Sequence, residues 1–141
     1  MSKIEKEFFV GNEVLFIGYS GKNQGFSKSI YQAFMDNGIK VYPVNTKPGG
    51  SYDVKVYNSL EELPRIPETA FVLLNRDRAL NAVKELAAKG IKRIQFQNRR
   101  SADAMVLSEC SKLGIETSVA CPLMKFGSGF HKFHGFLAGV R

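Results

Sequence analysis

Short apolar runs alternate with longer amphipathic stretches along most of this chain, and this alternation constrains its fold more than any other feature. Short apolar runs bounded by turn residues are typical of buried strands, whereas apolar residues three and four positions apart indicate helices. Strands that alternate with helices predict a parallel sheet with right-handed crossovers. We therefore predict an α/β fold, a three-layer Rossmann-like domain with a five-stranded parallel sheet. The predicted strands are residues 13–18, 40–45, 70–75, 92–97 and 115–120.

Three long helices and one short helix are expected between these strands. The long helices cover residues 25–38, 76–90 and 101–114, and each ends at a glycine, which is a common helix stop. Ser27 and Ser101 are the candidate N-caps, because a serine hydroxyl can accept a hydrogen bond from a free helix N–H group. The short helix is expected to start at Asn58 or Ser59 and to end before Pro64.

Length and composition are those of an ordinary globular domain. The chain has 141 residues, of which 44% are hydrophobic and 23% charged. We expect one domain over residues 1–141, with a core at about 13–122 and a basic aromatic tail at 123–141. No apolar run approaches the roughly 20 residues that span a bilayer, and the charged start lacks a signal-peptide pattern. We therefore expect a cytoplasmic protein with no membrane partner and with Cys110 and Cys121 reduced.

The chain is basic, with a net charge of +7 and a pI of about 9.5. Such a balance suits a polyanionic partner, either nucleic acid or a phosphate-rich small molecule, although a solvated basic surface would give the same balance. Parallel α/β sheets bind ligands at the carboxyl ends of their strands, near the point where the strand order reverses. The loops after the predicted strands are therefore where a binding site is expected.

The first of these loops, "GYSGKNQGFS", favours a phosphate ligand. Gly18, Gly21 and Gly25 allow close backbone approach, and the helix that follows offers free N–H groups and the positive end of its dipole. Ser20 and Lys22 add a hydroxyl group and a positive charge. The glycine spacing is neither the dinucleotide fingerprint nor a P-loop, so a simple tight turn is the alternative to phosphate binding.

The next three loops each carry basic residues. Asn45, Thr46 and Lys47 follow the second strand, where a NAD-binding domain often has an acidic residue. This argues against NAD and for a ligand with a further phosphate, although a solvated lysine is the alternative. Arg76 and Arg78 begin a helix, at the end where the dipole does not favour a cation. The fourth strand is followed by residues suited to amides, an adenine edge or anions: Gln97, Asn98, Arg99 and Arg100.

These loops show no catalytic constellation, and we expect neither a catalytic site nor a metal site. They contain no carboxylate pair and no acidic metal cluster. His131 and His134 lie in the tail, without an acidic or cysteine ligand close in sequence. We expect the tail phenylalanines to cover an apolar surface of the same domain or of a second subunit, which leaves a homodimer open; stacking on a base is the alternative. These residues are Phe126, Phe130, Phe133 and Phe136.

Four motifs in fixed order resemble a known family: "FIGYSGKNQGF", "YPVNTKPGG", "KVYNSLEELP" and "ACP". The set is similar to the CoA-binding domain at the start of the succinyl-CoA synthetase α subunit. It is even more similar to the small stand-alone CoA-binding proteins of bacteria and archaea. The resemblance extends from about residue 13 to about residue 122, and the ordered set is more specific than any single motif. It implies a Rossmann-like domain that binds coenzyme A.

The resemblance also implies which residues bind coenzyme A. The turn at 20–24 would hold its phosphates, and Lys47 would stand where the synthetase has a CoA-binding lysine. Arg76 would stand where the stand-alone proteins have a polar or basic residue, and the end of the fourth strand would line the nucleotide. The implied cofactor-binding residues are Gly18, Ser20, Gly21, Lys22, Asn23, Gln24, Lys47, Arg76, Phe96, Gln97 and Asn98.

The sequence departs from the family pattern in several places. The first turn is one residue longer than in the synthetase, which allows the assignments from Lys22 to Gln24 to shift by one. The fourth strand ends in "QNRR", where the synthetase has small and acidic residues. Thr46 stands where the stand-alone proteins usually have a proline. The phosphohistidine-bearing and nucleotide-grasp domains of the synthetase are absent, so the resemblance does not imply ligase activity.

We therefore predict a non-catalytic or accessory module, not an enzyme, whose small-molecule ligand is coenzyme A or an acyl-CoA. A NADP-type nucleotide-binding protein or oxidoreductase is the second hypothesis, because the basic loop after the second strand would suit NADPH. A basic nucleic-acid-binding module is the third and least favoured hypothesis.

Overall fold

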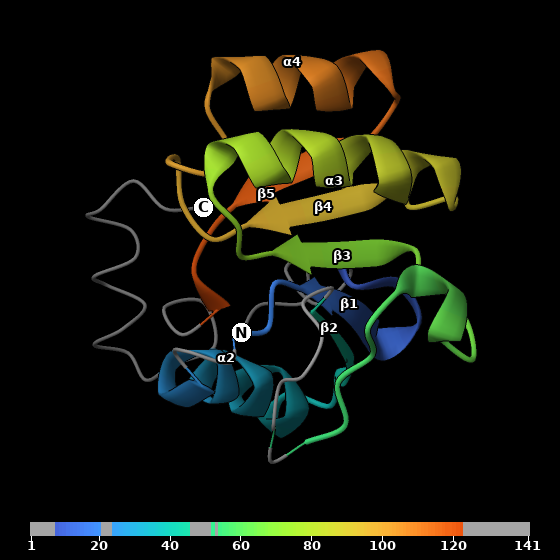
Figure 1. The fold of residues 1–141 in the computed structure, drawn as a ribbon, viewed down its shortest axis with the longest axis vertical. Helices are drawn as coiled ribbons and strands as arrows, with labels where there is room; N and C mark the ends of the chain where they lie inside the picture. The colour runs from blue at the N-terminus through green and yellow to red at the C-terminus, as the bar shows by residue number, and fades with distance from the viewer. Residues whose placement is uncertain (1–7, 21–23, 46–51, 53, 123–141) are drawn as a thin grey trace.

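A computed structural model describes residues 8–20, 24–45, 52 and 54–122 (Figure 1). Its regular elements follow the expected alternation of strands and helices. In chain order they are the 3-10 helix η1 (Val10–Asn12), β1 (Glu13–Ile17), α2 (Gln24–Asp36), β2 (Lys40–Val44), the 3-10 helix η2 (Leu60–Glu62), β3 (Thr69–Val72), α3 (Arg76–Ala88), β4 (Arg93–Phe96), α4 (Ala104–Lys112) and β5 (Glu116–Val119).

The five strands form one parallel sheet in the order β2-β1-β3-β4-β5. Phe16 of β1 lies in register with Pro43 of β2 on one side and with Phe71 of β3 on the other. The chain runs from β1 to β2 in one direction and then returns past β1 to β3. The strand order therefore reverses between β1 and β3, and the carboxyl ends of these two strands mark the expected place for a ligand. The predicted fold class is confirmed.

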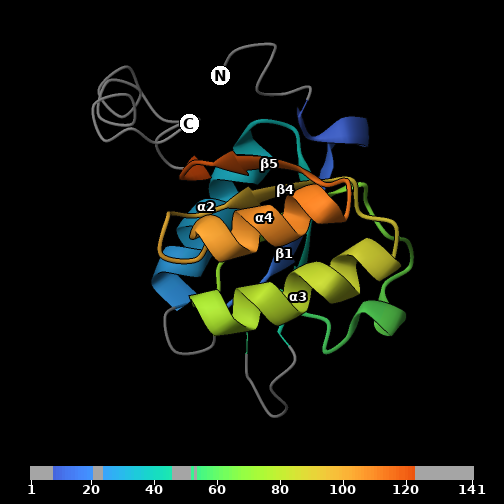
Figure 2. The same cartoon turned by 90° about the horizontal axis from the view of Figure 1, so that it is seen from above.

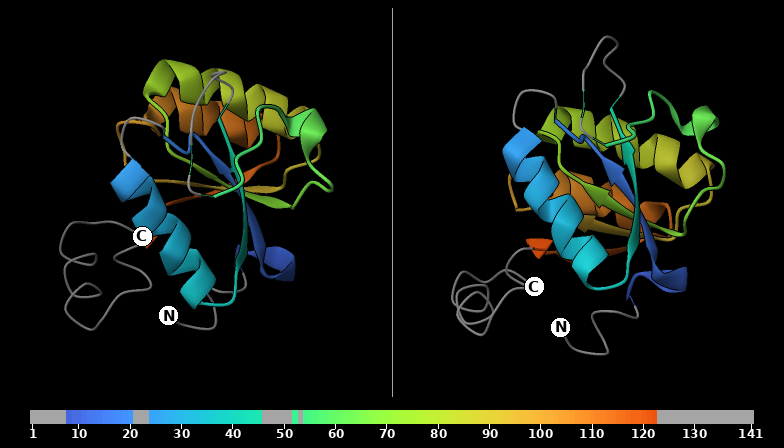
Figure 3. Two further views of the ribbon diagram at one scale, coloured as in Figure 1. Left: turned by 60° about the horizontal axis from the view of Figure 1, so that its bottom comes forward. Right: turned by 90° about the horizontal axis from the view of Figure 1, so that it is seen from below.

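Helices cover both faces of the sheet (Figure 2). Figure 3 shows α2 on one side, with α3 and α4 together on the other. On the α2 side the core is aromatic, and the ring of Phe71 packs edge-on against Phe16 and Phe34, with ring centroids 5.1 and 5.7 Å apart. On the α3 side the core is mainly aliphatic, with Leu15, Val72, Val83 and Ile94 buried. Burial of such side chains stabilises the domain by roughly 1.5–3 kcal/mol for each residue.

The helix starts differ from two of the predictions. Helix α2 begins at Gln24, so Ser27 is not its N-cap but a buried residue of its first turn. Helix α4 is capped by Asp103 and not by Ser101, since the Asp103 carboxylate accepts a 3.0 Å hydrogen bond from the Val106 N–H group. Ser59 holds the N-cap position of η2 without a side-chain hydrogen bond. No helix in the described part of the chain is both long and apolar enough to cross a membrane.

Cys110 is a buried thiol on α4, packed in the aliphatic core. Desolvation, with a smaller effect from Glu109, raises its pKa from 9.0 to about 11. Because an unfolded thiol ionises near pH 9, the stability linked to this shift is present below pH 9 and is lost as the pH rises toward 11. In a Cys121→Ser background, we expect a thiol reagent at pH 8 to label Cys110 far more slowly in native than in urea-unfolded protein. Equal rates in the two states would contradict this burial.

Candidate ligand-binding site at the carboxyl edge of the sheet

Gly18 ends β1 in a conformation and a space that suit only glycine. Its φ angle is +95°, and an added Cβ would lie 2.3 Å from the carbonyl oxygen of Leu73. The Gly18 N–H group donates a 2.9 Å hydrogen bond to the carbonyl of Val44 at the end of β2. Gly18 therefore lets the chain pass close over the ends of both neighbouring strands, at the point where the strand order reverses.

The turn that follows is fixed at both ends by polar contacts. The Ser20 N–H group donates a 3.0 Å hydrogen bond to the Ser27 hydroxyl, which lies buried in the first turn of α2. The Asn45 side-chain amide donates a 2.7 Å hydrogen bond to the carbonyl of Tyr19. These bonds hold the end of β1 against both the start of α2 and the end of β2. The N-terminus of α2 thus faces the carboxyl edge, where its free N–H groups and dipole favour an anion.

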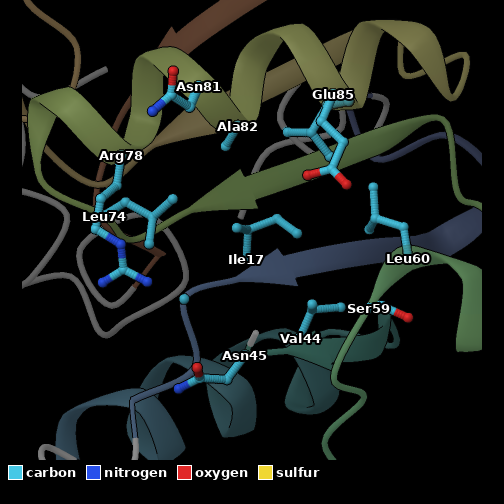
Figure 4. Close-up of a pocket in the computed structure, with 12 residues that line it drawn as sticks. Ile17, Val44, Asn45, Ser59, Leu60, Leu74, Arg78, Asn81, Ala82 and Glu85 are labelled. Atoms are coloured by element: carbon cyan, nitrogen blue, oxygen red, sulfur yellow. The ribbon is translucent and has the colours of Figure 1, made fainter. Parts of the chain in front are cut away.

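A pocket of about 270 Å³ opens beside these strand ends, between α3 and η2 (Figure 4). In the described part of the crossover from β2 to β3, the only helix is the three-residue η2, where a doubly wound fold often has a full helix. The floor and walls are largely apolar, and the polar groups come from α3, η2 and the ends of β1 and β2. The lining residues are Ile17, Gly18, Val44, Asn45, Ser59, Leu60, Leu74, Arg78, Asn81, Ala82, Glu85 and Leu86.

Arg78 is the basic residue that the structure places at the pocket, and it is not among the site residues implied by the resemblance. Figure 4 shows its guanidinium group descending from α3 toward the end of β1. Among the described residues this group has no ion-pair partner. The spacing of Arg78, Asn81 and Glu85 places all three on one face of α3, so this signal was available in the sequence.

Arg76 has different surroundings, although it lies only two residues earlier. Its guanidinium group contacts Asp103 at 2.5 Å, Asp77 at 3.1 Å and the Met105 sulfur at 2.9 Å. A hydrogen bond from the Val106 N–H group lowers the pKa of Asp103, and Arg76 lowers it further. Arg76 therefore joins the starts of α3 and α4, with its charge partly balanced, and does not line the pocket.

The end of β4 also lies apart from the pocket lining. Phe96 is fully buried in the aliphatic core. Asn98 closes its own turn, since its side-chain oxygen accepts a 2.9 Å hydrogen bond from the Arg100 N–H group. The side-chain oxygen of Gln97 is buried without a hydrogen-bond partner in the described part of the chain.

The remaining implied residues are only partly described. Gly18 lines the pocket, and Ser20 lies in the turn beside it. Gln24 opens α2. Gly21, Lys22, Asn23 and Lys47 lie outside the described residues, as do His131 and His134. Within the described residues, no three or more His, Cys, Asp and Glu side chains gather in a group that could hold a metal ion.

Comparisons with solved structures find the same fold in several archaeal proteins. A conserved hypothetical protein from Pyrococcus furiosus is 23% identical, with a TM-score of 0.65, over 76% of this chain and 91% of its own. A hypothetical protein from Pyrococcus horikoshii is 18% identical, with a TM-score of 0.71, over 87% of this chain and 89% of its own.

A larger enzyme contains the same fold as one of its parts. The dinucleotide-forming acetyl-coenzyme A synthetase 1 from Ca. Korarchaeum cryptofilum is 18% identical, with a TM-score of 0.60, over 82% of this chain but only 27% of its own. No curated protein matches the chain. The model of the CoA binding domain family matches residues 12–126, which include all of the sheet and the pocket. The resemblance seen in the sequence is thereby confirmed, and the chain belongs to the CoA binding domain family.

Proposed function

We propose that this protein binds coenzyme A or an acyl-CoA at the carboxyl edge of its sheet, as a non-catalytic or accessory module. The observation that carries this proposal is the pocket at the reversal of strand order, because it combines an apolar floor with the guanidinium group of Arg78. Ligands of open parallel sheets bind at this place in the fold.

Coenzyme A has the parts that this edge suits. Its adenine ring is flat and largely apolar on its faces, so the floor formed by Ile17, Val44 and Leu60 can accept it. Its diphosphate and 3′-phosphate need cations and N–H donors, which Arg78 and the start of α2 supply. The assignment of Lys22 and Lys47 as further phosphate ligands stays a prediction.

The described pocket lining offers little for nucleophilic catalysis. Its one hydroxyl group belongs to Ser59, and it contains no histidine or cysteine that could activate that hydroxyl group. This supports a binding role, in which the protein holds the ligand or reports its level. If the protein converted an acyl-CoA to a product, the proposal of a non-catalytic role would have to be revised.

Calorimetric titration of the purified protein tests the ligand, with coenzyme A, dephospho-CoA and NADPH measured under the same conditions. We expect saturable binding of coenzyme A at micromolar concentrations and weaker binding of dephospho-CoA. Tight binding of NADPH without binding of coenzyme A would replace this proposal with the NADP hypothesis. Binding of neither, together with steeply salt-dependent binding of DNA or RNA, would favour the nucleic-acid hypothesis.

Lys47→Ala should weaken coenzyme A more than dephospho-CoA, because we assign Lys47 to the 3′-phosphate that dephospho-CoA lacks. A charge-assisted contact of this kind is worth about 1.5–3 kcal/mol, so the loss for coenzyme A should be about tenfold or more. The same titration checks this result. Equal losses for the two ligands would remove Lys47 from the 3′-phosphate.

A further inference from the structure

The pocket has two charged lining side chains, one at each end. Arg78 and Glu85 both belong to α3 and are seven residues apart, which is about 10.5 Å along a helix. No ion pair joins these two described side chains. Figure 4 shows the guanidinium group of Arg78 near the end of β1, whereas the carboxylate of Glu85 points into the space above Ile17 and Leu60.

The ion pairs near Glu85 do not involve its carboxylate, which can therefore bind a ligand group. Lys89 lies four residues after Glu85, a spacing at which the two would normally pair on a helix. Its ammonium group instead contacts the Glu61 carboxylate of η2 at 2.7 Å. In the part of the chain that the structure describes, the carboxylate of Glu85 has no ion-pair or hydrogen-bond partner. A hydrogen-bond acceptor thus faces the apolar floor near Ile17 and Leu60.

A carboxylate in this position favours a ligand that presents a hydrogen-bond donor to it. Ionised carboxylates only accept hydrogen bonds, so the ligand group that meets Glu85 must carry an N–H or O–H donor. The apolar floor favours a flat ring, and Arg78 places the anionic part of the ligand at the opposite end. A phosphorylated aminopurine meets all three requirements, with its exocyclic amine toward Glu85 and its phosphates toward Arg78.

We propose that Glu85 is a specificity-determining residue that accepts a hydrogen bond from the exocyclic amine of the adenine ring. This inference rests on the proposed function, because it assigns the adenine of the ligand to the pocket between α3 and η2. Glu85 would then distinguish adenine nucleotides from nucleotides whose purine ring lacks the amine.

The test compares ADP with purine riboside 5′-diphosphate, which lacks only the amine, as competitors for bound coenzyme A. Wild-type protein should prefer ADP by about tenfold or more, as expected for a hydrogen bond to a charged acceptor. Glu85→Ala should bind the two competitors equally. Glu85→Gln keeps an acceptor oxygen and should retain part of the preference. Lys84→Ala, an exposed change on the same helix outside the pocket lining, should leave the preference at its wild-type value.

The outcomes separate this inference from the proposed function. If wild-type protein binds coenzyme A but does not prefer ADP, or if Glu85→Ala keeps the preference, the inference is overturned while the proposed function stands. If wild-type protein does not bind coenzyme A, both are overturned. Thermal unfolding of each variant shows whether a lost preference comes from a lost fold; Glu85 is exposed, so we expect no large change.

Discussion

Gly18→Ala is expected to lower the free energy of unfolding by about 3 kcal/mol or more. Two costs add at this position. The φ angle of +95° disfavours any residue with a Cβ, and the new Cβ would lie 2.3 Å from the Leu73 carbonyl oxygen and 2.9 Å from a methyl carbon of Leu74. Backbone atoms cannot move aside as a flexible side chain can, so the ends of β1 and β3 must separate. Urea unfolding followed by circular dichroism measures the loss.

Two other glycines provide matched controls for this prediction. Gly25 lies in α2 with nothing within 4 Å of an added Cβ, so Gly25→Ala should leave stability unchanged or raise it by up to about 1 kcal/mol. Gly38 has a φ angle of +75° but open space around it. Gly38→Ala should therefore show the conformational cost alone, about 1 kcal/mol. A Gly18→Ala loss no larger than that of Gly38→Ala would contradict the close approach to β3.

Arg78→Gln should weaken coenzyme A binding by about tenfold to a hundredfold, the loss expected when a charge-assisted hydrogen bond to phosphate is removed. Stability should hardly change, because the Arg78 side chain is exposed and has no ion-pair partner among the described residues. Titration with coenzyme A measures the loss, and the phosphate-free pantetheine arm should bind wild type and variant equally if Arg78 contacts only phosphate.

The charge change itself needs a control, since the whole chain is basic. Arg93 begins β4 at the opposite edge of the sheet and pairs with Glu116 at 3.1 Å. Arg93→Gln alters the net charge by the same amount as Arg78→Gln but lies away from the pocket. We expect it to change coenzyme A affinity by less than about twofold. Similar losses in the two variants would mean that general attraction, and not contact at the pocket, explains the effect of Arg78.

The sequence predicted the sheet well because each strand carries its own evidence. The run from Glu13 to Gly18 is apolar and ends at a glycine, and that pattern needs no knowledge of the rest of the chain. Helix starts were harder to predict. The Ser27 hydroxyl accepts its hydrogen bond from Ser20, across a turn, whereas a cap bonds its own helix. Ser101 and Asp103 are both good N-caps by residue type. In the structure the helix begins at Ala104, so Asp103 and not Ser101 accepts the hydrogen bond from the Val106 N–H group.

The residues of the binding site were harder still to predict from the sequence. Arg76 and Arg78 are basic residues in the first turn of the same helix, yet two residues turn a helix by about 200°, so the two side chains leave α3 in opposite directions. Arg76 meets Asp103, which comes from a different helix and lies 27 positions later in the chain, and no local pattern predicts that contact. The pocket itself lies beside the crossover between β2 and β3, whose described part contains only the three-residue helix η2, and no local pattern predicts how that segment packs. Composition indicated a basic ligand edge, and helical spacing groups Arg78 with Asn81 and Glu85, but only the fold shows that this face of α3 lines the pocket.

The pocket between α3 and η2 has a consequence for how such a protein can change over time. The large apolar residues beside the pocket, such as Leu60 and Leu86, are still buried in the aliphatic core. The side chains that would meet a ligand from α3, namely Arg78, Asn81 and Glu85, are exposed. They can be exchanged with little effect on folding. On α3, ligand preference and stability therefore depend largely on different positions, and a scaffold of this kind can change the residues that meet its ligand there without first losing its fold.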